Sequence, residues 1–268
     1  MKAVGYFLLN TVQLVFLCVY SLVLMTVALI VAIFSGEATL WMARHMWSPG
    51  LIWISRARVE IVPGAKLGKG PYVFLMNHQS MVDIPFAFAY IPINIRFVAK
   101  KVLQKVPFLG WYMRSAKMIF VDRRDRAQAL ASLEEAGRRI REGASILAYP
   151  EGTRSTAGEI LPFKKGPFNV ALAAGVPIVP VVVDGTGTLL PRGGFKVRPC
   201  LVRMTIGEPI PTHGLGQKDI EPLMRRVRDA MIDLHLEIGG QGGDRDDAIA
   251  APGQEGIGRP VAKVRRAA

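Results

Sequence analysis

The first pattern along the chain is a long run of apolar residues at its start. Positions 3–36 carry no charged side chain. The densest apolar part, residues 14–34, is long enough as a helix to cross a hydrocarbon core of roughly 30 Å. A cleaved signal peptide is the alternative, but residues 33–37 make a poor cleavage site and Lys2 is a weak basic leader. We therefore expect residues 1–36 to form a retained hydrophobic membrane anchor.

Aromatic and basic residues alternate in the next segment, residues 37–57. It contains three of the chain's four tryptophans, Trp41, Trp47 and Trp53, and tryptophan favours the boundary between headgroups and acyl chains. One or two of them could instead pack into a domain core. Three beside a membrane segment favour a Trp/Arg-rich interfacial helix, which we expect to be broken at residues 48–50. Because Lys and Arg are concentrated after the anchor, we expect the main domain to face the cytoplasm.

Short apolar runs alternate with helical stretches through residues 58–238. This alternation predicts one α/β domain. The clearest helix is expected at 125–142, with Asp125 as its N-cap and Gly143 as its stop. At the end of the chain, residues 239–268 lack periodicity and begin with a glycine-rich run, so we expect a disordered tail. The expected strands are 58–62, 72–76, 96–99, 118–121, 145–149, 178–184 and 201–206.

The net charge of +13 adds an anionic partner to this picture. Nucleic acid and an acidic membrane surface with phosphorylated substrates are the two candidates. Aromatic residues do not interleave with Lys and Arg as they do in single-strand binders, which disfavours nucleic acid. The two cysteines, Cys18 and Cys200, form no Cys-x-x-Cys pair, so neither a metal site nor a disulfide framework is indicated.

The most concentrated candidate chemistry lies in residues 77–83, Asn-His-Gln-Ser-Met-Val-Asp, directly after the expected strand 72–76. A polar turn at the end of a buried strand is where α/β sheets place their chemistry. On one continuous helix His78 and Asp83 would point roughly 140° apart. They can therefore meet only if His78 lies in the turn and Asp83 in the first helical turn. Taken alone, the pair is most simply a hydrogen-bonded His and a capping Asp.

Two further strand ends carry arginine. Residues 119–123 end in an Asp-Arg pair, and residues 149–155 read Tyr-Pro-Glu-Gly-Thr-Arg-Ser. Arginine suits phosphate because its planar fork donates two hydrogen bonds at once. Backbone N–H groups and a hydroxyl at a glycine turn add donors for the same anion. Arg123 and Arg154 could thus converge on one phosphate near His78, although surface ion pairs are the alternative for either stretch alone.

These stretches form an ordered set of motifs: Asn77-His78-x4-Asp83, Phe120-Val121-Asp122-Arg123, residues 150–155 and residues 176–181, with Leu-Pro-Phe-Lys-Lys-Gly at 161–166 between the last two. Their order and spacing resemble those of the glycerolipid acyltransferases, and within them the bacterial 1-acylglycerol-3-phosphate acyltransferases. The resemblance covers residues 58–211. Tyr149 stands where phenylalanine is usual, and Val102 stands where many members have a polar residue.

The resemblance implies a single mixed-sheet acyltransferase domain with flanking helices, preceded by the membrane-anchoring segment. Its reaction would move an acyl group from acyl-CoA or acyl-carrier protein to the free sn-2 hydroxyl of 1-acylglycerol-3-phosphate, giving phosphatidic acid for phospholipid synthesis. No cofactor beyond the acyl donor, no metal and no nucleic-acid partner are implied. The expected location is the phospholipid surface of a bacterial cytoplasmic membrane, with the catalytic domain on the cytoplasmic side.

The resemblance also implies roles for individual residues. His78 would take the proton of the attacking hydroxyl while Asp83 holds the imidazole. Glu151 would bind the glycerol or hold an arginine in place. The full substrate-binding set is Arg123, Glu151, Gly152, Thr153 and Arg154, with Asn77 in support.

Three alternatives remain open at this point. The acceptor could be another lysolipid, such as lyso-ornithine lipid, because related acyltransferases share these motifs. A hydrolase could use Ser80 with His78, although two residues so close in one turn make a productive hydrogen bond awkward. A non-enzymatic basic membrane or nucleic-acid binder would account for the charge but not for the Asn-His-x4-Asp motif.

Overall fold

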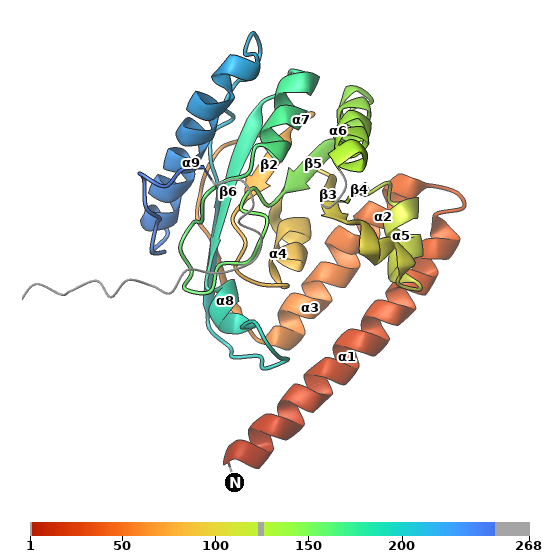
Figure 1. Ribbon diagram of the computed structural model, residues 1–268. Coiled ribbons are helices and arrows are strands. Elements are labelled where there is room, and N and C mark those ends of the chain that lie inside the picture. Colours follow the sequence, from red (N-terminus) through yellow and green to blue (C-terminus); the bar gives the residue numbers. More distant parts are fainter. Residues whose placement is uncertain (1, 123–125, 250–268) are drawn as a thin grey trace, which may run out of the picture.

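A seven-stranded sheet with strand order β1-β7-β6-β2-β5-β3-β4 forms the centre of the molecule (Figure 1). The computed structural model describes residues 2–122 and 126–249. Neighbouring strands are parallel except β6 and β7, which are antiparallel. The mixed-sheet α/β prediction is therefore confirmed, and each expected strand is present with ends that differ by at most one residue. The strands are β1 Arg58–Ile61, β2 Val73–Met76, β3 Ile95–Lys100, β4 Ile119–Val121, β5 Ser145–Ala148, β6 Ile178–Asp184 and β7 Leu201–Ile206.

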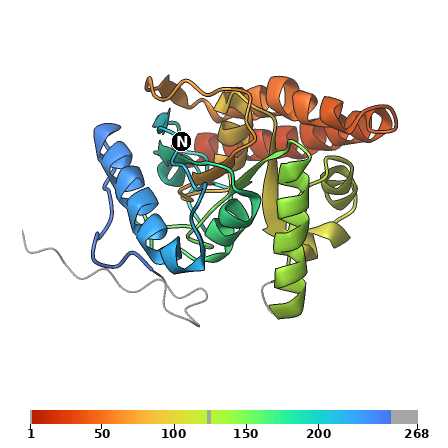
Figure 2. The ribbon, with the colours of Figure 1, turned by 90° about the horizontal axis from the view of Figure 1, so that it is seen from above.

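Helices cover both faces of the sheet, as Figure 2 shows from above. They enclose two apolar cores, one on each face. Successive side chains of a strand point to opposite faces, so Phe74 and Met76 of β2 pack into one core while Val73 and Leu75 pack into the other. The first core lies against α2 Gly36–Met42, α3 Ser48–Ser55, α4 Asp83–Tyr90 and α5 Leu109–Ser115. The second lies against α6 Arg126–Arg141, α7 Gly166–Ala174 and α9 Ile220–Glu237. Shorter helical turns are η2 Lys101–Lys105, α8 Thr186–Leu189 and η3 Gln217–Asp219.

Helix α1, Lys2–Val31, runs along the outside of the first helical layer (Figure 1). Within the described part of the chain it is the one helix long and apolar enough to cross a membrane, and most of its side chains are exposed. It is nevertheless attached to the domain by polar contacts. Gln13 is buried and donates to the carbonyl of Ile54 over 2.8 Å, and Trp47 donates to the Ser21 hydroxyl over 2.9 Å. The candidate membrane anchor is thus packed on the domain.

The expected break at residues 48–50 is wrong. Helix α2 passes through one π-helical turn, η1 Ala43–Trp47, directly into α3. Pro49 lies in the first turn of α3, where its missing N–H and fixed φ are tolerated, and the π turn absorbs the change in hydrogen-bond register. Two of the three tryptophans here, Trp41 and Trp53, are 52% and 73% exposed.

The bounds of helix α6 and the C-terminal segment, residues 239–268, were also predicted from the sequence. Helix α6 ends where Gly143 takes a left-handed φ of 91°, as the sequence predicts, whereas the expected N-cap Asp125 lies outside the described residues. Residues 239–249 were expected to be disordered, but they pack on the domain: Ile160 donates to the Gly242 carbonyl over 2.7 Å, and Ile249 forms a β-bridge with Phe163. Residues 250–268 of the expected tail lie outside the described residues.

Candidate active site

The sequence motifs meet at one edge of the sheet. Strands β5, β2 and β6 lie side by side and parallel, so their carboxyl ends share an edge. His78 follows β2, Glu151 follows β5, and β6 ends at Asp184. The site is therefore built from turns that are far apart in sequence and are brought together by strand pairing.

His78 lies in the turn after β2, and Asp83 is the first residue of α4. Their side chains meet with His78 Nδ1 2.6 Å from Asp83 Oδ2. A carboxylate oxygen accepts hydrogen bonds, so Nδ1 carries a proton and Nε2 is left with the lone pair. The ring is partly exposed while Asp83 is fully buried. This arrangement suits a general base whose orientation is fixed from behind.

Asp83 also organises the turn that carries His78. The same oxygen, Oδ2, accepts from the backbone N–H groups of Gln79 and Ser80 over 2.8 and 2.9 Å. The capping interpretation of Asp83 is wrong, because Val82 is the N-cap of α4 and the Asp83 carboxylate instead holds the turn that precedes the helix. A change at this position would disturb the turn as well as the imidazole.

The loop after β5 holds the backbone of His78 on both sides. Glu151 Oε1 accepts from the N–H of His78 over 3.4 Å, and Ser155 donates its N–H to the carbonyl of His78 over 2.7 Å. Between them, Gly152 takes a left-handed φ of 70°, a conformation that favours glycine. The Glu-Gly-Thr-Arg-Ser loop and the His78 turn therefore form one rigid unit.

Glu151 is buried, and so is Asp83, whose charge acts on it. Burial raises the pKa of Glu151 well above its usual range; the hydrogen bond from the His78 N–H opposes this, and the negative charge of Asp83 adds to it. Burial therefore favours the protonated form of Glu151 in the folded protein. It contacts the His78 backbone, a contact that neither of its expected roles includes.

The ring of Tyr149 stacks on that of His78, with centroids 3.9 Å apart and an interplanar angle of 17°. Its hydroxyl is buried, and burial followed by the charge of Asp83 raises the pKa of the phenol well above its usual range. Tyr149, which stands where phenylalanine is usual, therefore stacks on the imidazole with a protonated phenol.

The remaining expected site residues have distinct places. Asn77 bonds to the backbone of Val183 in both directions, donating over 2.9 Å and accepting over 2.8 Å, which ties the start of the turn to β6. Thr153 and Arg154 are half-buried in the loop after β5, and the Arg154 carbonyl accepts from the guanidinium of Arg192 over 3.0 Å. Arg123 lies outside the described residues.

Ser80 does not reach the imidazole as a nucleophile would. It is fully buried, and its hydroxyl donates to the carbonyl of Leu190 over 2.7 Å. The hydrolase alternative therefore has no support in this geometry.

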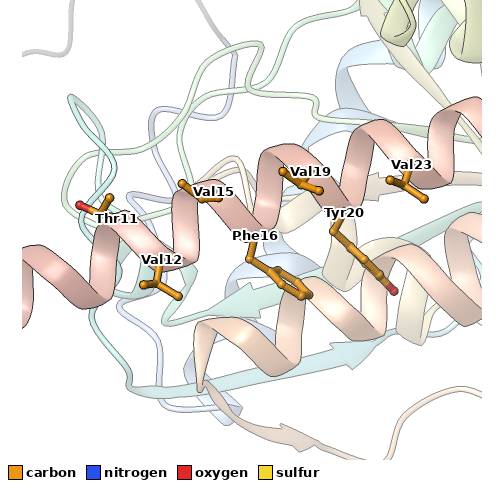
Figure 3. Close-up of a pocket in the computed structure, with 7 residues that line it drawn as sticks. All are labelled: Thr11, Val12, Val15, Phe16, Val19, Tyr20 and Val23. Atoms are coloured by element: carbon orange, nitrogen blue, oxygen red, sulfur yellow. The ribbon is translucent and has the colours of Figure 1, made fainter.

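A separate groove of about 530 Å³ lies on α1 (Figure 3). It is lined by α1 alone and is apolar, with Phe16 and Tyr20 pointing the same way along the helix. None of its residues belongs to the His78 site. Among the described residues, no group of three or more His, Cys, Asp or Glu side chains could hold a metal ion.

Comparisons with known proteins place this geometry in a family. A family model described as acyltransferase matches residues 54–184. A 1-acyl-sn-glycerol-3-phosphate acyltransferase of Limnanthes alba is 35% identical over 189 residues, which cover 70% of this chain and 67% of that protein. The chain belongs to the acyltransferase family.

Two other relatives extend the comparison. A 1-acyl-sn-glycerol-3-phosphate acyltransferase of Saccharomyces cerevisiae is 40% identical over 185 residues, covering 68% of this chain but only 61% of the yeast protein. The crystal structure of the 1-acyl-sn-glycerophosphate acyltransferase of Thermotoga maritima matches with a TM-score of 0.77 at 26% identity, covering 89% of this chain and 98% of that one. The resemblance inferred from the motifs is thus confirmed.

Several members of the site were not found by sequence reasoning. Ser155 stood inside a motif without a role, and Gln79 was assigned no part although it neighbours His78. Asp184 lies three residues beyond the 176–181 motif and was assigned no role, and His235 lies far along the chain from every motif. The one available signal was that His235 lies at a buried position in an amphipathic helix, where an apolar residue is the usual choice.

Proposed function

We propose that this acyltransferase moves an acyl group from acyl-CoA or acyl-carrier protein to the free sn-2 hydroxyl of 1-acylglycerol-3-phosphate, giving phosphatidic acid. The observation that carries the proposal is the contact between His78 Nδ1 and Asp83 Oδ2, which leaves Nε2 free to accept a proton at the sheet edge. The relatives, which are named as 1-acyl-sn-glycerol-3-phosphate or 1-acyl-sn-glycerophosphate acyltransferases, support the choice of acceptor.

The reaction requires two proton movements at His78. Nε2 takes the proton of the acceptor hydroxyl as its oxygen attacks the thioester carbonyl, and Asp83 stabilises the imidazolium that forms. The tetrahedral intermediate then collapses, the C–S bond breaks, and the imidazolium returns the proton to the departing thiolate. His78 ends as it began, and no covalent acyl-enzyme is needed. Positioned acid–base help of this kind contributes about 10²–10⁴ in rate.

The loop after β5 would hold the acceptor phosphate. Arg154 supplies the bidentate fork, and Thr153 lies beside it as a hydroxyl donor. The N–H of Gly152 donates to the Tyr149 carbonyl over 3.1 Å, so Gly152 would serve this site through the turn that its left-handed φ of 70° allows. Arg123 is proposed for the same phosphate. Because Ser155 and Glu151 fix this loop to the backbone of His78, phosphate binding would also place the hydroxyl relative to Nε2.

The acceptor and its product both reside in lipid, so the site must work at a membrane surface. Helix α1 and the exposed Trp41 and Trp53 supply apolar surface for this contact. We propose the cytoplasmic face of a bacterial cytoplasmic membrane. The Lys and Arg content that follows the anchor supports the cytoplasmic side, and the resemblance of the motifs to bacterial enzymes supports a bacterial membrane.

The test is a product assay on the full chain in detergent. A panel of lysolipids, including 1-acylglycerol-3-phosphate and lyso-ornithine lipid, is supplied with acyl-CoA or acyl-carrier protein, and products are read by mass spectrometry. We expect phosphatidic acid from the wild type and none from His78→Ala, with His213→Ala, which alters an exposed histidine, as the matched control. A wild type that acylates only another lysolipid would replace the proposed acceptor. Full activity in His78→Ala would overturn the mechanism.

A further inference from the structure

A second His–Asp pair lies behind the proposed active site. His235 of α9 is fully buried, and its Nε2 is 3.4 Å from Oδ1 of Asp184, the last residue of β6. The backbone N–H of Gly242 donates to His235 Nδ1 over 3.2 Å. An imidazole that accepts at Nδ1 carries its proton on Nε2, so the N–H side of the imidazole faces Asp184, although Nε2 makes no hydrogen bond within the described residues.

Asp184 is in turn bonded to Gln79, the residue that follows His78. The side-chain amide of Gln79 donates to Asp184 Oδ1 over 3.2 Å and to the carbonyl of Gly158 over 3.1 Å. Its oxygen accepts from the Thr186 hydroxyl and the Gly187 N–H, each over 3.4 Å. The amide NH2 group thus donates two hydrogen bonds and the amide oxygen accepts two, which is the full capacity of a primary amide. The Gln79 side chain is therefore held in one orientation.

The charge on Asp184 fits this arrangement. Burial alone raises the pKa of a carboxyl group, but here the nearby imidazole of His235 and the hydrogen bond from Gln79 outweigh burial and hold the pKa of Asp184 below its usual range. Asp184 is therefore a carboxylate at neutral pH that accepts from Gln79 and lies 3.4 Å from His235 Nε2.

Together these contacts form a closed circuit that passes through the active-site loops. From Gln79 the path runs to Gly158, along the chain to Ile160, and across to the carbonyl of Gly242 over 2.7 Å. The N–H of Gly242 then leads back through His235 and Asp184 to Gln79.

The His78 turn and the loop after β5 that carries Arg154 are both bonded to this circuit of contacts. The N–H of Gln79 donates to Asp83 Oδ2, the oxygen that also holds His78. The Gly158 N–H donates to the hydroxyl of Ser155, whose own N–H bonds to the His78 carbonyl. The circuit is thus joined to the His78 turn through Gln79, and through Ser155 to the loop after β5, residues 149–155, which we call the Arg154 loop.

We infer that His235 is a positioning residue which acts through Asp184 and Gln79 to fix His78 and the Arg154 loop for the acyl transfer proposed above, and the inference rests on that function. A purely structural need would be met by an apolar side chain, because a buried polar pair is often no more stabilising than well-packed hydrophobic residues. Catalysis gives a different reason, since small displacements of a reacting group cost large factors in rate.

Two variants of the full chain separate these roles. His235→Gln places a side-chain amide near the Nε2 position and keeps a donor for Asp184. His235→Asn places its amide near the Nδ1 position, so it keeps an acceptor for Gly242 and loses the donor for Asp184. The exposed His213→Asn is the control for the substitution itself.

We expect His235→Gln to retain kcat within about threefold of the wild type, and His235→Asn to lose about 10- to 100-fold in kcat, in line with the cost of misplacing a reacting group. The KM for the acyl donor should not change in either. A double-mutant cycle that combines His235→Asn with Gln79→Met adds a second readout, because the effects of two residues that act through one another on kcat are not additive. The double variant should be no slower than Gln79→Met alone.

Equal losses in the Gln and Asn variants, or activities per folded molecule that simply follow the melting temperature, would assign His235 to stability and overturn the inference. Independent, multiplying effects in the cycle with Gln79 would do the same. If the wild type forms no acylated product from any lysolipid, the proposed function itself fails and the inference falls with it.

Discussion

Ser155 donates its backbone N–H to the carbonyl oxygen of His78 over 2.7 Å. This bond joins two loops that follow different strands, β5 and β2, and that lie 77 positions apart in the chain (155 minus 78). Glu151 makes the complementary contact to the His78 N–H. The proposed general base and the proposed phosphate loop are therefore one mechanical unit.

Replacing Asp83 should separate its two tasks. Asp83→Ala removes the acceptor of three buried or half-buried N–H donors, and each donor left unpaired costs about 1–3 kcal/mol of stability. Asp83→Asn keeps an oxygen for the turn but removes the charge that stabilises the imidazolium. We expect Asn to leave the melting temperature nearly unchanged and to lower kcat by roughly 10²-fold, less than the loss in His78→Ala. Wild-type kcat in Asp83→Asn would show that the charge has no catalytic part.

Arg154→Lys should weaken use of the phosphorylated acceptor more than use of the thioester. Lysine keeps the positive charge but loses the planar fork, and one charge-assisted hydrogen bond contributes roughly 1.5–3 kcal/mol. That loss corresponds to a rise of roughly 10- to 100-fold in acceptor KM. Arg225→Lys on the exposed side of α9 is the matched control. A change confined to the thioester KM would move Arg154 to the donor site.

Glu151→Gln should change the pH dependence of stability in a defined direction. Because the pKa of Glu151 is raised above 4.5 in the folded state, both states are protonated at low pH, and the wild type and the variant should then melt alike. As pH rises above 4.5, the unfolded chain ionises while the folded chain keeps its proton, so the wild type loses stability relative to Glu151→Gln until the folded pKa is passed.

Melting temperatures of both proteins in the same detergent at pH 4 and pH 8 check this. We expect the difference to favour Glu151→Gln at the higher pH. The variant should also keep most of its activity, because glutamine is a neutral shape-match that still accepts from the His78 N–H. A stability difference that is the same at both pH values would mean that Glu151 is ionised in the folded state.

Two tryptophans of the Trp/Arg-rich segment should respond differently to truncation. Trp47 bonds to Ser21 and packs edge-on against Phe88 with centroids 6.2 Å apart, so Trp47→Ala should destabilise the fold by up to about 3–5 kcal/mol. Trp53 is exposed, so Trp53→Ala should leave the melting temperature unchanged. It should instead reduce turnover on vesicle-borne acceptor relative to acceptor dispersed in detergent. Equal turnover ratios in Trp53→Ala and wild type would remove Trp53 from the membrane contact.

The sequence by itself determined the strand pattern, the order of the motifs and the apolar α1. These features are local: a strand shows as a short apolar run, and a membrane-length helix as a long uncharged one. The meeting of His78 and Asp83 could be anticipated for the same reason, since both lie within one turn of chain between β2 and α4. Even the left-handed stop at Gly143 could be read from neighbouring residues.

The tertiary structure decided what lies between distant segments. Local pattern placed a break at Pro49, but the π turn that carries the helix past it is held by packing of α1, α3 and α4. Glu151 and Ser155 could be found as motif residues, yet their bonds to the His78 backbone exist only because β2 and β5 are neighbours. His235 comes to Gln79 through Asp184 because α9 packs on β6. Hydrogen bonds of this kind depend on strand order and helix docking, which are set by the burial of whole faces and leave no local period in the sequence.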